Sequence, residues 1–219
     1  FNYDSLKEIA LEKTFSAFPL RGLTLSSEIH NKVRYLQSHN IAAVKKGLTQ
    51  PDEYILFMAH WDHLGFMDGA NQDEDKIANG AVDNATGVAA VLEFAKRFSE
   101  IETDRSIMFL AVTLEESGLL GSEYFAKYPP IDLSNIVAGF NYDAILPTGL
   151  TNDMVVVGYG ASELEDLLED ELSKSGRYIN PDPNPDKGFF YRSDHISFAK
   201  RGVPVLYSGG RFDLANGGK

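Results

Sequence analysis

The segment Arg105–Gly121 joins an apolar run to two adjacent carboxylates, a combination that could do chemistry. Residues 107–114 are rich in β-forming apolar side chains, which predicts a buried strand. Glu115 and Glu116 follow directly, at the strand end where α/β proteins place their ligands. Burying two carboxylates is costly unless a cation compensates them, and residues 106–126 contain no Lys or Arg. The segment therefore indicates a metal site.

Further oxygen and imidazole donors stand at the ends of other predicted elements. Strands are predicted over residues 53–59 and 135–141, and an amphipathic helix over residues 85–98. The donors beside these elements are His60 with Asp62, Asp83, Asp143 and, after an aromatic run, His195. Such donors suit zinc or a similar divalent ion. Because a carboxylate can bridge two zinc ions about 3.5–4 Å apart, the sequence holds enough donors for a metal pair.

Each of these residues, taken alone, also has a purely structural interpretation. Asp83 before a helix is most simply an N-cap, with Asn84 as the alternative cap. A single His at a strand end is commonly a hydrogen-bonded polar residue, and Glu115 with Glu116 could be exposed loop charges. Taken together, these interpretations would require five unrelated coincidences at one edge of one sheet. We therefore favour the metal site.

The elements that must position these donors alternate between strand and helix, which favours an α/β fold with a largely parallel sheet. A hairpin is predicted from residues 33–36 and 40–45, on either side of a short polar turn. Residues 68–80 are acidic and lack periodicity, so we expect a loop with solvated charges there.

The composition of the chain limits the kinds of partner that it can bind. The 219 residues with 43% hydrophobic content suit one domain, and we expect a single domain over residues 1–219. The 20 basic and 32 acidic residues give a net charge of -12, which disfavours nucleic acid and anionic membrane surfaces as partners. No apolar run approaches the roughly 20 residues of a membrane-spanning helix, so no membrane insertion is expected. The absence of cysteine excludes disulfides and thiolate ligands, but not zinc bound by His and carboxylate.

Five segments of the chain, in order, resemble the motifs of the M28 family of zinc metallopeptidases, the co-catalytic aminopeptidases. They are AHWDHLG (59–65), GAVDNATGVAAVLE (80–93), TLEESGLLGSEYF (113–125), NYDA (141–144) and YRSDHISFA (191–199). The resemblance extends from about residue 40 to about residue 210. It implies a three-layer α/β/α sandwich around a mixed, largely parallel central sheet, of the zinc-exopeptidase type.

The resemblance also implies roles for the donors. Two zinc ions would be bound by His60, Asp83, Glu116, Asp143 and His195, with Asp83 bridging them. Glu115 would be the general base and Asp62 the carboxylate that orients His60. Neighbouring residues on a strand point to opposite sides, which agrees with one ligand and one base in the glutamate pair. A cis peptide between Asp83 and Asn84 is also implied.

The function that follows is a di-zinc aminopeptidase, which hydrolyses N-terminal peptide bonds of peptide substrates with a metal-bridging water. The substrate-pocket candidates are Tyr191, Phe190 and Phe189, although aromatic residues at such spacing are commonly core residues. One alternative is a glutaminyl-cyclase-like enzyme of the same fold with one zinc ion, and retention of His60 and Asp143 argues against it. Another alternative is a catalytically silent, metal-stabilised binding module, and Glu115 argues against that.

The resemblance carries expectations about the ends of the chain as well. The family usually continues after the last strand through another His and a closing helix, so we expect this chain to lack a C-terminal segment. Residues 1–30 resemble a remnant of a preceding segment. Export to the periplasm or out of the cell is implied, by a leader that this chain does not contain. The sequence carries no signal of the oligomeric state.

Overall fold

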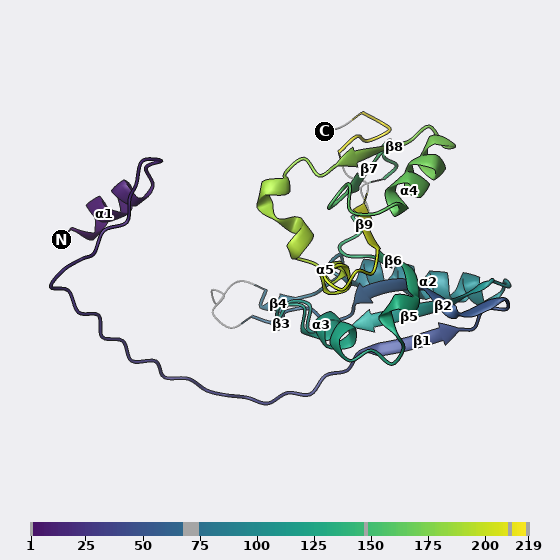
Figure 1. Cartoon of the computed structure of the whole chain (residues 1–219), viewed down its shortest axis with the longest axis horizontal. Helices are drawn as coiled ribbons and strands as arrows, with labels where there is room; N and C mark the ends of the chain where they lie inside the picture. Colours follow the sequence, from purple (N-terminus) through teal and green to yellow (C-terminus); the bar gives the residue numbers. More distant parts are fainter. Residues whose placement is uncertain (1, 68–74, 147–148, 210–211, 218–219) are drawn as a thin grey trace. The chain divides into compact units, whose positions relative to one another are not determined.

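The computed structural model describes residues 2–67, 75–146, 149–209 and 212–217 (Figure 1). The chain divides into two units, Phe1–Leu36 and Gln37–Lys219. In the first unit, helix α1 (Tyr3–Ala10) has no buried residue, and the side chain of Asn2 caps it. The second unit contains the sheet and all five segments that carry the family resemblance. The extent of the catalytic domain over residues 1–219 stays a prediction.

A seven-stranded sheet forms the centre of the second unit, in the order β1-β5-β2-β6-β9-β7-β8. The strands are β1 (Ile41–Lys45), β2 (Gln50–His60), β5 (Arg105–Val112), β6 (Ile136–Asn141), β7 (Asp153–Val156), β8 (Tyr178–Pro181) and β9 (Val205–Gly209). Four of the neighbouring pairs are parallel, whereas β1 pairs with β5 and β7 with β9 in the antiparallel sense. The sheet is therefore mixed and largely parallel, as the sequence predicts.

Helices cover both faces of this sheet. They are α2 (Ala85–Ser99), α3 (Leu120–Lys127), α4 (Leu164–Ser173) and α5 (His195–Ala199), together with the short 3-10 turns η1 (Leu133–Asn135), η2 (Pro185–Lys187) and η3 (Phe189–Tyr191). Side chains of β2 alternate between the two faces. Leu56 and Met58 pack with α3 and α5, whereas Phe57 and Ala59 pack with α2. The three-layer α/β/α architecture is thus confirmed.

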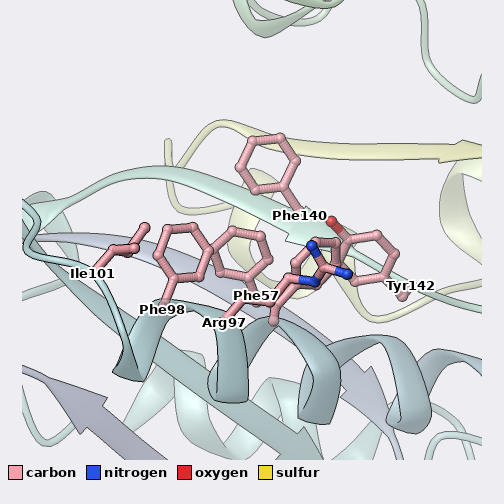
Figure 2. A pocket seen from close by; sticks show the side chains of 7 residues that line it. Phe57, Arg97, Phe98, Ile101, Phe140 and Tyr142 are labelled. Carbon is pink, nitrogen blue, oxygen red and sulfur yellow. The ribbon is translucent and has the colours of Figure 1, made fainter.

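The face beneath α2 is dominated by aromatic rings. Phe57 lies at its centre, with ring centroids of Phe94, Phe98, Phe140 and Tyr142 at 5.0, 5.4, 5.3 and 6.4 Å (Figure 2). A cavity of about 340 Å³ opens between these rings, and its lining contains no histidine and no carboxylate. This cavity therefore offers no imidazole or carboxylate ligand to a metal ion.

Most predicted elements are confirmed, and the exceptions involve partners that are distant in sequence. The predicted strands at residues 53–59, 107–114 and 135–141 correspond to β2, β5 and β6, and the predicted helix corresponds to α2. The predicted hairpin is wrong. Residues 33–36 form no strand, while β1 pairs with β5 and places Ile41 opposite Ala111. An isolated two-stranded hairpin is only marginally stable, so β1 joins the larger sheet.

The predicted loop at residues 68–80 is confirmed only in part. Residues 68–74 lie outside the described residues. Nearer the following helix, β4 (Ile77–Ala78) pairs antiparallel with β3 (Gly65–Phe66) and forms a separate two-stranded sheet. Across the ranges that the structure describes, no helix is both long enough and apolar enough to cross a bilayer.

Leu56 provides a test of this packing, because its side chain is 0% exposed between β2 and the α3–α5 layer. We expect Leu56→Ala to lower the free energy of unfolding by about 2–5 kcal/mol, through lost burial and a residual cavity. Urea denaturation followed by circular dichroism measures this loss. The control Leu150→Ala alters a side chain that is 83% exposed and should change stability by no more than about 0.5 kcal/mol. Equal effects of the two substitutions would contradict the assignment of this face as core.

Candidate metal centre

Three neighbouring parallel strands bring the predicted donors to one edge of the sheet. His60 ends β2, Glu115 follows β5, and Asp143 follows β6. Since β5, β2 and β6 are adjacent and parallel, their carboxyl ends meet at the same edge. The pairing of β2 with β5 continues one residue beyond β2, because the Trp61 N–H donates to the Val112 carbonyl at 2.9 Å.

Asp83 reaches the same edge from the segment that enters α2. The Asp83–Asn84 peptide bond is cis, as the family resemblance implies. Asn84 caps α2 by accepting a hydrogen bond from the Gly87 N–H at 3.0 Å. Its amide also donates to the Tyr142 carbonyl at 2.8 Å. Asn84 therefore connects the segment of Asp83 to that of Asp143, and it settles which of the two candidate residues caps the helix.

The first group of donors consists of His60, Asp83 and Asp143, whose ligand atoms all lie within 4.8 Å of one another. Nε2 of His60 is 3.1 Å from Oδ1 of Asp83 and 3.3 Å from Oδ1 of Asp143. A tetrahedral zinc ion with bonds of about 2.0–2.1 Å separates its ligand atoms by about 3.3–3.4 Å. The group therefore has the dimensions of a zinc site.

The second group consists of His63, Asp83 and Glu116, again with ligand atoms within 4.8 Å of one another. Nδ1 of His63 lies 2.6 Å from Oε1 of Glu116. Asp83 belongs to both groups. The bridging role that the resemblance assigns to Asp83 stays a prediction, and its membership of both groups is compatible with it.

Some potential metal-ligand atoms of the second group have no hydrogen-bond partner, which tests whether a cation fits among them. Nδ1 of His63, Oδ1 of Asp83 and Oε1 of Glu116 are buried and have no hydrogen-bond partner among the described residues. Each buried polar atom without a partner costs about 1–3 kcal/mol. A divalent cation held by these three side chains would remove this cost, and imidazole nitrogen with carboxylate oxygen is a donor set that zinc prefers. The residues present thus fit a zinc ion.

His195 is not part of either group, although the resemblance assigns it to the second ion. The side chain is completely buried at the start of α5, and its ring lies 5.0 Å from the rings of Phe190 and Tyr207. Neither ring nitrogen has a hydrogen-bond partner within normal geometry in the described ranges. Burial lowers the pKa of His195 to about 4, against the opposing charge of Asp143. Its role as a ligand stays a prediction.

Asp62 contacts both His60 and Glu115, but through different atoms. Its backbone carbonyl accepts a hydrogen bond from Nδ1 of His60 at 3.1 Å, while its carboxylate lies 3.9 Å from that nitrogen. The carboxylate accepts a hydrogen bond from the Glu115 N–H at 3.2 Å. The orientation of His60 expected from the Asp62 side chain is therefore supplied by its main chain. Because this bond places a proton on Nδ1, Nε2 is the atom available to a metal.

Glu115 is half-buried and surrounded by charge. Burial raises the pKa of Glu115 to about 8; the positive charge of His60 opposes the rise, and the nearby carboxylate of Asp194 adds to it. A general base is most effective when its pKa lies near the working pH. A cation bound beside it would favour the carboxylate form.

His60 and Asp143 form a coupled pair in the protein without metal. Burial opposes protonation of His60, but the hydrogen bond and charge of Asp143 outweigh it and raise the pKa of His60 to about 9. Burial would likewise raise the pKa of Asp143, yet hydrogen bonds from His60 and Ser193 lower it. The Ser193 hydroxyl donates to Oδ2 of Asp143 at 2.6 Å and accepts from the Asn141 amide at 2.7 Å. Ser193 thus engages Oδ2 of Asp143, while Oδ1 contacts His60.

An open cavity of about 360 Å³ lies beside the glutamate pair. It is lined by Glu115, Glu116, Gly118, Leu119, Tyr191 and Arg192. Of the three aromatic residues proposed for the pocket, Tyr191 is the one that lines this cavity. Phe190 packs against His195, and Phe189 lines a different cavity with Val155 and Tyr207.

Sequence reasoning missed His63, Ser193 and Asn141. His63 belongs to the quoted AHWDHLG segment, three residues after His60, and two histidines at that spacing beyond a strand end could have indicated a second imidazole ligand. Ser193 and Asn141 carried no such signal, because their roles depend on contacts between β6 and the segment before α5.

The fold and the donor set define an α/β protein that can hold metal ions at the carboxyl edge of its sheet. The chain belongs to peptidase family M28, whose model matches residues 40–215. A relative named "Probable zinc metalloprotease" from Pyrenophora tritici-repentis (strain Pt-1C-BFP) is 36% identical over 105 residues, 48% of this chain and 24% of that protein. Aminopeptidase YwaD of Bacillus subtilis (strain 168) is 32% identical over 111 residues, 49% of this chain and 22% of that protein. The chain thus spans less than a quarter of the length of either relative.

Solved structures share the fold. An aminopeptidase from Aneurinibacillus sp. strain AM-1 matches with a TM-score of 0.62 at 25% identity, covering 81% of this chain and 40% of that one. A glutaminyl cyclase from Bacteroides thetaiotaomicron matches with a TM-score of 0.56 at 21% identity, covering 77% and 62% of the two chains. The predicted fold class is therefore confirmed by comparison as well as by topology.

Zinc binding at pH 7 should release protons. His60, with its pKa of about 9, is protonated at that pH in the protein without metal, and Nε2 must lose its proton to bind a cation. Zinc affinity should accordingly rise between pH 7 and about 9. Isothermal titration in two buffers of different ionisation enthalpy measures the number of protons released. Identical binding enthalpies in the two buffers would contradict this expectation, and His60→Ala should release fewer protons than the unaltered protein.

Proposed function

We propose that this chain is the catalytic part of a zinc-dependent aminopeptidase, which hydrolyses the N-terminal bond of peptide substrates. The observation that carries the proposal is that Asp83 belongs to two donor groups while Glu115, with its raised pKa, lies at the same sheet edge. Membership of family M28 supports a peptidase, and the relatives named as a zinc metalloprotease and an aminopeptidase support this class.

The proposed site contains two zinc ions. His60, Asp83 and Asp143 would hold the first, while Asp83, Glu116 and a histidine would hold the second. Two divalent cations carry four positive charges, which balance the three carboxylate ligands and Glu115. This balance supports a pair of ions, because one ion would leave excess negative charge among partly buried side chains.

The zinc ions, when bound, would supply Lewis-acid activation of the attacking water and of the peptide carbonyl. The protein contributes the proton transfer. The Glu115 carboxylate takes a proton from the water as it attacks the carbonyl carbon, and then gives that proton to the departing amine nitrogen. Asp62 supports this role by accepting a hydrogen bond from the Glu115 backbone, which holds Glu115 at the end of β5.

The cavity beside Glu115 is the proposed place for the N-terminal residue of the substrate. Gly118, Leu119, Tyr191 and Arg192 line it together with the glutamate pair. A side chain bound in this cavity would place the first peptide bond within reach of Glu115. The substrate partners we propose are accordingly peptides with a free N-terminus.

A cyclase acting on N-terminal glutaminyl peptides is the second candidate, because the solved glutaminyl cyclase shares the fold and His195 lies outside both donor groups. That reaction would use a single bound ion, whereas the presence of His60 and Asp143 favours a pair. A zinc-dependent assay with an aminoacyl anilide and with a glutaminyl peptide separates the two: release of the aniline supports the aminopeptidase, and cyclisation alone supports the cyclase. A binding module without catalysis would give neither product.

Glu115→Gln tests the proposed general base. The substitution keeps the size of the side chain and removes its ability to take a proton, so kcat should fall by roughly 10²–10⁴ or more. Zinc content should stay the same, since Glu115 belongs to neither donor group. Steady-state hydrolysis of an aminoacyl anilide and elemental analysis measure the two properties. Unchanged hydrolysis would contradict the role of Glu115.

Glu116→Gln is the matched substitution at the adjacent position. It replaces an anionic ligand of the second group by a neutral one, so zinc should bind more weakly and dialysed protein should retain fewer equivalents. Elemental analysis after dialysis against buffered zinc measures the loss. If Glu115→Gln lost zinc and Glu116→Gln kept it, the assignments of base and ligand would be reversed.

A further inference from the structure

The segment between β4 and α2 contains an asparagine followed by a glycine, Asn79–Gly80, and Gly80 lies three residues before Asp83. An asparagine side chain can react with the backbone nitrogen of the next residue, and glycine hinders this attack least because it has no Cβ. We propose that Asn79–Gly80 is a site of spontaneous deamidation, and that the isoaspartate it forms displaces Asp83 and weakens the candidate metal centre. The inference goes beyond the proposed function, because the modification needs neither substrate nor catalysis.

The reaction needs no reagent other than water. The backbone nitrogen of Gly80, after losing its proton, attacks Cγ of Asn79 and closes a five-membered succinimide ring. The bond from Cγ to the side-chain nitrogen breaks, and this nitrogen leaves with a proton as ammonia. Water then opens the ring at either of its two carbonyl carbons, which gives aspartate in one case and isoaspartate in the other. In isoaspartate the main chain runs through Cβ, so the backbone becomes longer by one methylene group.

Both reacting groups of this dipeptide are available. Asn79 is exposed, and its side-chain amide has no hydrogen-bond partner among the described residues. Within the same ranges the Gly80 N–H has no partner either, although the Gly80 carbonyl accepts a hydrogen bond from the Ala85 N–H at 2.9 Å. The attacking nitrogen therefore has no hydrogen bond to break, and the amide that it attacks faces solvent.

A second Asn–Gly pair, Asn216–Gly217, provides an internal comparison. Asn216 is exposed as well, but the Gly217 N–H donates a hydrogen bond to the Leu214 carbonyl at 3.0 Å. This bond must open before the Gly217 nitrogen can attack, which should slow the reaction by roughly 2–10-fold, the effect of one hydrogen bond. Asn79 is therefore expected to react first.

The fold requires glycine at position 80, and so retains the residue that makes Asn79 labile. Gly80 has φ of +65°, a conformation that side chains disfavour. A Cβ atom built on it would lie 3.1 Å from Cβ of His63 and 3.2 Å from the Asp83 carbonyl oxygen. A larger residue would therefore push this segment away from the position in which it delivers Asp83.

The added methylene group would be inserted where the backbone has no slack. Before it, Ala78 is paired with Gly65 across the small sheet, and after it, Gly80 packs against His63. One more carbon lengthens this path by about 1.5 Å, whereas metal–ligand distances vary by only about 0.2 Å. Asp83 belongs to both donor groups, so a shift of its segment weakens the whole centre.

Peptide mapping of aged protein tests the modification. The unaltered chain is incubated at mildly acidic and at mildly alkaline pH, and isoaspartate is located by mass spectrometry of its peptides. We expect isoaspartate at Asn79, formed faster at alkaline pH because more of the backbone nitrogen is deprotonated. Conversion at Asn79 should be roughly 2–10-fold faster than at Asn216. Intact Asn79 in protein that has already converted Asn216 would overturn the proposal.

Zinc binding by the separated products tests the consequence. Each product carries one additional carboxylate, and ion-exchange and hydrophobic-interaction chromatography separate the aspartate and isoaspartate forms. The aspartate form keeps the normal backbone and should bind zinc as fresh protein does. The isoaspartate form should bind zinc roughly 10–100-fold more weakly, as when a group that supports a metal ligand is lost. Equal zinc affinity of the two forms would overturn the displacement of Asp83.

Asn79→Gln is the matched control, because its longer side chain would have to close a six-membered ring, which forms much more slowly. The exposed side chain of Asn79 has no partner to lose, so the variant should fold and bind zinc like the unaltered chain. On ageing, Asn79→Gln should keep its zinc affinity while the unaltered chain loses it. Equal losses would overturn the proposal. Absence of aminoacyl-anilide hydrolysis by fresh protein would contradict the proposed function alone, since deamidation and zinc binding are measured without substrate.

Discussion

The repulsion between carboxylates at one edge of the sheet is the constraint on which the rest of this site depends. Asp83, Glu116 and Asp143 converge there with Glu115, and Asp194 lies buried close by. Both oxygens of Asp194 lack hydrogen bonds of normal geometry within the described residues, and burial raises the pKa of this carboxyl to about 7. So many partly buried anions are compatible with a stable fold only if protons or cations neutralise them. The geometry of the donors provides for cations.

The sheet makes this concentration of charge tolerable. β5, β2 and β6 are parallel and adjacent, so each contributes a donor at its carboxyl end while its apolar side chains are buried on both faces. Asn84 and Asn141 then connect the polar segments by hydrogen bonds that no apolar packing could supply. Each of these strands therefore stabilises the fold through the buried apolar side chains along its length, and it carries its candidate ligand at its carboxyl end.

The sequence was sufficient for the elements whose signal is local. The apolar runs that end at His60 and before Glu115 predicted β2 and β5, and the helical spacing after Asn84 predicted α2. It was insufficient where the outcome depends on distant partners. β1 pairs with β5 rather than with residues 33–36. His63 belongs to the second donor group and His195 does not, because of how the chain turns beyond β2 and how the rings pack around α5. Side-chain direction at the end of a strand is set by such tertiary contacts.

Trp61 stands between His60 and Asp62, and it is the single tryptophan of the whole chain. Its backbone bonds to Val112, and its indole N–H donates to the His39 carbonyl at 3.1 Å, with 47% of the residue exposed. The ultraviolet emission of this protein, when excited at wavelengths that tyrosine does not absorb, thus originates one peptide bond away from a candidate ligand. The chain therefore carries a built-in optical reporter beside its candidate metal centre, without any added dye.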